Sequence, residues 1–153
     1  MWITLTEADV LGRLSRPELT ALTSAAKATS QTSEGILATA IEVVTRKVRG
    51  YVGGCSKNKL GDGNTIPDEL TDAALALVRN HLFTRLPGMA DLNDTIRQKE
   101  TENATAELKD VARCLIAIVA PETAAPQQPA GPAIQLVSSR KRQATRTKTS
   151  GLL

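Results

Sequence analysis

The sequence is poor in aromatic residues, and this limits how its core can be built. Trp2, Tyr51 and Phe83 are its only aromatics, 2% of 153 residues. A core with so few large rings must be filled by Leu, Ile, Val and Ala, which suits helices that approach each other closely. The composition therefore favours an all-α fold, a small helical bundle.

Residues for catalytic and metal chemistry are also scarce. His81 is the single histidine, and it shares a helical face with Leu77 and Leu82. We interpret it as a structural histidine, packed or helix-capping, rather than as the base of a catalytic triad. One histidine and two dispersed cysteines fall short of the four ligands of a structural zinc site. We expect no enzyme activity, no metal and no cofactor.

Cys55 and Cys114 lie far apart in the chain and form no CxxC motif. The sequence therefore predicts two ordinary thiols, with Cys114 in a helix core, rather than a disulfide framework. Long apolar runs are missing too: none approaches the ~20 residues that cross a bilayer. The N-terminus lacks a signal-peptide pattern, so we expect a protein that stays inside the cell that makes it and contacts no membrane.

Charge is unevenly distributed although the net charge is only +3. Residues 1–120 contain 14 basic and 15 acidic residues, whereas residues 121–153 contain five basic residues and only Glu122 as an acid. The basic character thus belongs to the C-terminal part. This pattern indicates a balanced body with an extended arm that docks on a partner.

The most regular stretch runs from Ile36 to Tyr51, where apolar residues recur every three or four positions. This spacing predicts the long central helix of the bundle, with Val44 on its packed face and Thr45 on the opposite face. Thr32 or Ser33 is the expected N-cap. Gly53 and Gly54 are expected to provide a left-handed exit.

Four further segments complete the predicted body. Thr6 with Asp9, and Ser15 with Glu18, mark the starts of two short helices separated from the central one by a flexible connection over residues 23–33. Pro67 is expected in the first turn of a helix that ends at Leu86-Pro87-Gly88. A last helix is predicted over residues 94–119, started by Asn93 or Asp94. Its apolar stripe comprises Leu108, Val111, Ala112, Leu115, Ile116 and Val119.

The loop from Gly53 to Thr65 is rich in Gly, Asn and Lys. It fails as a phosphate-binding P-loop because Asn58 and Leu60 replace the second glycine and the hydroxyl residue of that motif. It fails as an EF-hand because Ile66 and Pro67 occupy essential positions. We therefore predict a mobile surface turn.

Proline dominates residues 121–133, which we predict to be an extended linker between a helical domain of residues 1–120 and an arm of residues 134–153. Within the arm, a short strand and a basic run form the predicted docking site. Its residues are Ile134, Gln135, Leu136, Val137, Arg140, Lys141, Arg142, Arg146 and Lys148. The basic run suits an acidic protein or nucleic acid, and a solvated tail is the alternative.

The order of these elements resembles the head-to-tail connector, or adaptor, proteins of Mu-like bacteriophages. The stretches that carry the likeness are TEADVLGRL with RPELTALT, VRGYVGG, IPDELTDAALALVRNHLF, ELKDVARCLIAI and the terminal RQATRTKTSGLL. The chain departs from the family after Gly54, where Cys55-Ser56 stands in place of Arg-Tyr, and at Ala144, where an aromatic residue is common.

The resemblance implies a structural virion protein at the head-tail junction, assembled in the host cytoplasm. Such a protein forms a homo-oligomeric ring, twelve-fold in this family, beneath the portal protein. Its C-terminal arm reaches onto the portal, its other side meets a tail-side connector or tail terminator, and DNA passes through without sequence-specific binding.

A small nucleic-acid-binding regulator is the main rival, with the two opening helices as a helix-turn-helix and the basic tail on phosphate. The candidate recognition segment ELTALTSAAKA carries only Lys27 as a basic residue. Recognition helices usually need several phosphate and base contacts, so the connector reading is favoured.

Overall fold

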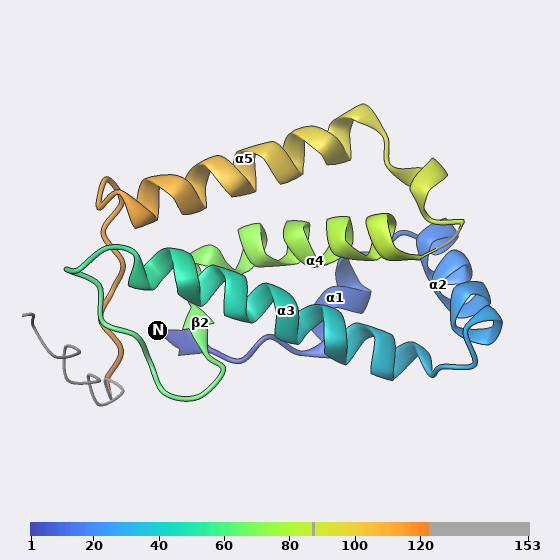
Figure 1. The fold of residues 1–153 in the computed structure, drawn as a ribbon, viewed down its shortest axis with the longest axis horizontal. Helices are drawn as coiled ribbons and strands as arrows, with labels where there is room; N and C mark the ends of the chain where they lie inside the picture. The colour runs from blue at the N-terminus through green and yellow to red at the C-terminus, as the bar shows by residue number, and fades with distance from the viewer. Residues whose placement is uncertain (87, 123–153) are drawn as a thin grey trace, which may run out of the picture.

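The computed structural model describes residues 1–86 and 88–122, and the fold is the predicted helical bundle (Figure 1). Five α-helices, two 3-10 turns and one small antiparallel sheet make up these residues. In chain order they are β1 (Trp2–Ile3), α1 (Glu7–Arg13), α2 (Arg16–Ala28), α3 (Ser33–Gly53), β2 (Ile66–Pro67), η1 (Asp68–Leu70), α4 (Thr71–Arg85), η2 (Ala90–Leu92) and α5 (Thr95–Ala112).

The three long helices α3, α4 and α5 lie side by side along the length of the molecule, each in contact with the other two (Figure 1). The N-terminal helix α1 contacts α3 and α4, while α2 packs on α3 at one end of the bundle. Val48, Val52 and Val78 are completely buried between these helices. Aliphatic packing therefore provides the core, as the scarcity of aromatic residues predicts.

Four predicted helix starts are confirmed by their caps, whereas the helix predicted to begin at Pro67 starts at Thr71 without a side-chain cap. Thr6 and Asp9 form a capping box at α1, and hydrogen bonds from Thr6 lower the pKa of Asp9. The Glu18 carboxylate accepts a hydrogen bond from the Ser15 amide at α2. The Thr32 hydroxyl accepts from the Gly35 amide at α3. These side chains replace the missing helical acceptors of the first turn.

Helix ends were less predictable than helix starts. Residues 23–28 belong to α2, not to a flexible connection, because Ala25 and Ala26 are buried against the bundle. Gly54 has φ −64° and therefore gives no left-handed exit from α3. The α4 helix ends at Arg85, next to Leu86, as expected.

The last helix is shorter than predicted, ending at Ala112 rather than near residue 119. Leu108 and Val111 are buried as expected, but Leu115, Ile116 and Val119 lie beyond the helix and are exposed. The chain turns at Cys114, which has φ +61°. Extending the apolar stripe past residue 112 was therefore wrong.

One face of α3 also differs from the prediction. Val44 is buried as expected, but Thr45 is buried too, with 3% of its surface exposed. Thr45 lines a groove together with Leu5 and Ile41, so the N-terminal segment lies beside this side of the helix. Burial on α3 thus extends farther around the helix than its spacing indicates.

The structure also contains a small sheet, which the sequence did not predict. Trp2 pairs with Pro67 and Ile3 with Ile66 in antiparallel register. The Asp68 amide also donates to the Met1 carbonyl oxygen. This sheet places the N-terminus at the same end of the bundle as the C-terminal end of α5 (Figure 1).

Candidate functional site

All residues of the predicted docking site, from Ile134 to Lys148, lie outside the described residues, as does nearly all of the predicted linker. The domain boundaries at residues 120 and 133 likewise stay predictions. The structure does describe where the C-terminal part leaves the body. We name residues 113–122 the arm root, and its contacts define the candidate functional site.

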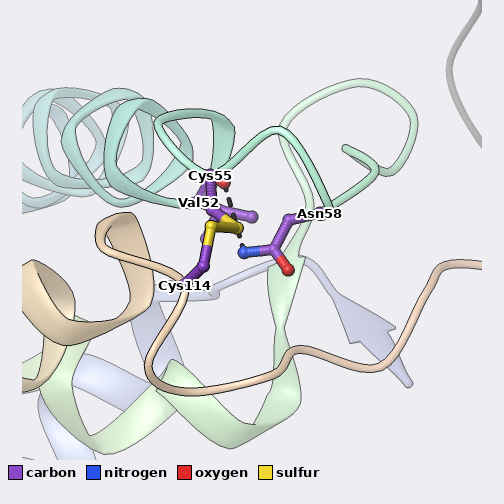
Figure 2. Close-up of a disulfide and its surroundings, with 4 residues drawn as sticks. All are labelled: Val52, Cys55, Asn58 and Cys114. Atoms are coloured by element: carbon purple, nitrogen blue, oxygen red, sulfur yellow. Dashed lines mark hydrogen bonds between the residues drawn. A yellow bond between two sulfur atoms is a disulfide. The ribbon is translucent and has the colours of Figure 1, made fainter.

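The arm root begins with a disulfide bond, which corrects the prediction of two free thiols. Cys55 and Cys114 are joined, with their Cα atoms 5.3 Å apart and a separation of 59 positions in sequence (Figure 2). Cys55 is buried, whereas Cys114 is exposed and lies outside any helix. Sequence reasoning missed the pair because the spacing of two distant cysteines contains no information about the fold that brings them together.

Each cysteine follows the cap of a long helix, Gly54 for α3 and Arg113 for α5. These two helix ends approach closely, since a Cβ atom on Gly54 would lie 3.3 Å from the Cβ of Ala112. The small residue at position 54 therefore permits the approach that the disulfide requires.

The turn at Cys114 has the hydrogen bonds of a Schellman motif. The Cys114 amide donates to the Val111 carbonyl oxygen, and the Leu115 amide donates to that of Asp110, over 3.0 and 2.9 Å. Glycine is the usual residue at this left-handed position. Here a cysteine occupies it, tied to α3 through its side chain.

A second attachment holds the arm root farther along. The indole Nε1 of Trp2 donates a hydrogen bond of 2.9 Å to the carbonyl oxygen of Val119, across 117 residues of sequence. Ile118 packs against the hydrophobic core. Residues 114 to 119 are thus fixed at both ends, so the chain leaves the body from a defined place.

Trp2 itself is held by the loop between α3 and β2. Gly61 lies against the indole ring, and a Cβ atom there would come within 2.7 Å of a ring carbon. The guanidinium of Arg49 donates to the carbonyl oxygens of Thr65 and Gly61, over 2.7 and 3.0 Å. The loop lies on the surface as predicted, but Arg49 ties its second half to α3.

The arm root exposes an unusual amount of apolar surface. Leu115 is 71% exposed and Val119 is 57% exposed, and Ile116 between them is also exposed. Large apolar side chains exposed close together commonly mark an interaction surface. A shallow groove of about 290 Å³ adjoins them, between Met1, Trp2, Asp62 and residues 119–122.

A charged cluster lies on α2, α4 and α5, toward the opposite end of the bundle, where α2 packs (Figure 1). The fully buried carboxylate of Glu18 on α2 lies 2.8 Å from Nε of Arg97 on α5 and 3.9 Å from Nε of Arg79 on α4. Arg79 also pairs with Glu100 at 2.9 Å. These contacts join three helices, so we assign the cluster to the fold rather than to a binding site.

His81 lies on the wall of a second groove, of about 300 Å³, with Thr29, Gln31 and Arg85. Burial is the main cause that lowers the pKa of His81, followed by the positive charges of Arg85 and Lys47. The described residues that line this groove include no carboxylate to orient the imidazole. The half-buried position of His81 on this wall agrees with a packed structural histidine.

The burial of residues on α2 does not support the helix-turn-helix alternative. Glu18, near the start of α2, is buried within the charged cluster. Leu22 and Ala25 face the bundle as well. The exposed surface of α2 offers Arg16 and Lys27 as its basic groups, which are few for a recognition helix.

Within the described part of the chain, no helix has the length and apolarity to span a bilayer, and no group of three metal-ligating side chains comes together.

No curated protein and no solved structure gives a significant match. The family model described as "Bacteriophage Mu, Gp36" matches residues 5–136. This range covers all five helices and reaches beyond the arm root. The chain belongs to the bacteriophage Mu Gp36 family.

Proposed function

We propose that this protein is a head-to-tail connector, a structural virion protein that forms a ring beneath the portal and links the DNA-filled capsid to the tail. The observation that carries the proposal is the arm root, which fixes the exit of the C-terminal segment at one end of a compact helical body. Membership of a bacteriophage family supports it. A rigid body with an arm of defined origin suits a subunit that contacts two partners at once.

The basic arm supplies the portal contact in this proposal. Arg140, Lys141 and Arg142, with Arg146 and Lys148, pair with acidic groups of the portal, and Ile134 to Val137 add a strand to its sheet. A single short arm makes a limited contact with the portal and therefore binds weakly. Repetition around a ring raises the effective concentration of every arm, so the assembled ring holds firmly.

The exposed apolar side chains of the arm root supply the contact between ring subunits. Leu115, Ile116 and Val119 lie next to the exit of the arm. Burying them against a neighbouring copy would therefore orient all arms toward the same side of the ring. The opposite side then meets a tail-side connector or tail terminator, and DNA runs through the channel without sequence readout.

The test is deletion of residues 133–153, compared with the intact protein. We expect the shortened protein to keep its helical circular dichroism and its melting temperature, because the described body lies outside the deletion. It should no longer co-sediment with DNA-free, portal-containing capsids. A variant with the five basic residues neutralised should bind more weakly, with the largest difference at low salt, where charges are least screened.

Two outcomes would contradict the proposal. One is stable attachment of the shortened protein to DNA-free portal. The other is attachment of the intact protein only when DNA is present, which would instead support the nucleic-acid-binding alternative.

A further inference from the structure

The two cysteines form a covalent clasp between helices that are distant in sequence. Cys55 follows the end of α3 and Cys114 follows the end of α5 (Figure 2). The α3–α5 contact at this point is otherwise made by small groups, with Gly54 against Ala112. Closing or opening one bond therefore changes how firmly the arm root is attached to the body.

We propose that Cys55 and Cys114 are a thiol–disulfide exchange site that is open while the protein is made and closes when it meets an oxidising medium. Phage proteins are made in the host cytosol, where thiols are kept reduced. Release of particles by lysis exposes them to low-molecular-weight disulfides. The clasp thus closes late and fixes the arm root in the structure described here. This inference rests on the proposed function to the extent that the protein leaves the host in the released particle, but it does not depend on the portal contact.

The difference in exposure between the two cysteine residues sets the order of the reaction. The exposed Cys114 thiolate attacks a low-molecular-weight disulfide, forms a mixed disulfide and releases one small thiolate. The buried Cys55 thiolate then attacks the Cys114 sulfur and releases the second. The protein loses two protons and two electrons, and the small disulfide is reduced to two thiols.

The electrostatic setting favours the closed form. Both cysteines lie at the C-terminal ends of long helices, where the helix dipole is negative. Such ends do not stabilise a thiolate, so the reduced form gains no stabilisation from them. A disulfide whose reduced form is not stabilised resists reduction, so the closed clasp should persist once it forms.

Opening the clasp removes the tether from a strained turn. Cys114 has φ +61°, a conformation that is disfavoured for a non-glycine residue. After opening, the remaining anchors of residues 114–119 are the two hydrogen bonds of the turn, the packing of Ile118 and the hydrogen bond from Trp2 to Val119. Trp2 is the only tryptophan of the chain, so its fluorescence reports on the arm root.

The test uses the full chain, incubated in mixtures of reduced and oxidised glutathione. In the oxidised mixture we expect a mass loss of about two hydrogens and a crosslinked peptide containing Cys55 and Cys114. In the reduced mixture, Trp2 emission should shift to longer wavelength. Exchange of the Leu115 amide, which donates to the Asp110 carbonyl oxygen, should be at least about tenfold faster, while exchange within α4 stays unchanged.

Cys114→Ser is the matched variant, because position 114 is exposed and the substitution leaves the core intact. It should show the fluorescence and exchange of the reduced protein in every glutathione mixture. Cys55→Ala removes the buried cysteine instead, and it should show the same fluorescence and amide exchange as Cys114→Ser.

Three results would overturn the inference. The first is a stable mixed disulfide at Cys114 without closure. The second is an intermolecular disulfide as the main product. The third is identical Trp2 fluorescence and arm-root exchange in the open and closed protein.

Discussion

Ser30 and Cys114 are the described non-glycine residues with left-handed backbone, and both end a helix in the same way. Ser30 has φ +54° after α2, and the next amide, that of Gln31, donates to the Ala26 carbonyl oxygen over 3.0 Å. Cys114 repeats this pattern after α5. The disulfide holds Cys114 in place, whereas Ser30 has no such tether. A glycine at position 30 would therefore remove the energetic penalty of the left-handed conformation.

Ser30→Gly should stabilise the protein by about 1 kcal/mol, because glycine adopts the left-handed region without the steric penalty of a Cβ atom. Ser24→Gly is the matched control. Ser24 is exposed in the interior of α2, where glycine should destabilise by roughly 0.5 kcal/mol. Urea denaturation of the two variants measures both effects. Equal destabilisation by both substitutions would show that residue 30 is not left-handed in solution.

The groove around His81 predicts a stability that depends on pH. Burial and the charges of Arg85 and Lys47 lower the pKa of His81 in the folded protein, so the unfolded chain takes up a proton first. The contribution of His81 to stability is full above about pH 6.5, the ordinary histidine value. It declines as the pH falls below 6.5 toward the lowered folded pKa.

Melting temperatures measured between pH 7.5 and about 5.5 check this, since carboxylates titrate mainly at lower pH. The protein should melt at lower temperature at the acid end of this range. His81→Asn should remove much of the decline. An unchanged slope in that variant would show that another group is responsible.

At the scale of elements, four of the five helix starts were predictable from the sequence, whereas the ends of α2 and α5 were not. Thr6, Ser15, Thr32 and Asp94 each mark a start, because a short polar side chain caps its own first turn. The end of α5 carries no Gly or Pro near Ala112. The turn after this helix is held by a disulfide to Cys55, which is distant in sequence. No local sequence pattern indicates such a contact.

The same limit explains Thr45 and the candidate site. The spacing of apolar residues along α3 identifies one packed face. It does not reveal that the N-terminal segment lies beside a second face of the helix. The arm root depends on contacts of Trp2 and Cys55 with residues at least 59 positions away. The predicted docking residues of the arm lie outside the described chain, so they remain a prediction.

The charged cluster predicts a specific weakness in the contact between α2, α4 and α5. Glu18→Gln should destabilise the fold by about 3 kcal/mol, because Arg79 and Arg97 stay mostly buried with one counter-charge fewer. Glu42→Gln is the control, since its pair with Arg46 is exposed and should contribute less than about 1 kcal/mol. Thermal unfolding measures both variants. Similar losses would mean that the cluster is hydrated in solution.

At the scale of the whole molecule, the bundle separates two kinds of surface. The charged cluster joins helices at one end, and the exposed apolar residues of the arm root lie at the other (Figure 1). The N-terminus and the exit of the C-terminal segment share this second end. Contacts with other subunits are therefore expected to concentrate there.

Leu115→Asp should convert an assembled ring into smaller species, because it places a charge in the apolar contact proposed between subunits. Ile96→Asp is the matched control: Ile96 is 70% exposed, close to the 71% of Leu115, but lies in the first turn of α5. Sedimentation velocity of the two variants provides the measurement. Loss of assembly in both, or in neither, would remove the arm root from the subunit contact.

The disulfide also determines whether proteolytic cleavage of the chain releases a fragment. Residues 55 to 114 form a closed covalent loop that contains all of α4 and α5. Cleavage at one point within this loop leaves two pieces that remain one molecule, whereas cleavage between α1 and α2 separates a fragment at once. Protease nicks near η2 should therefore be silent on a denaturing gel until a reducing agent is added.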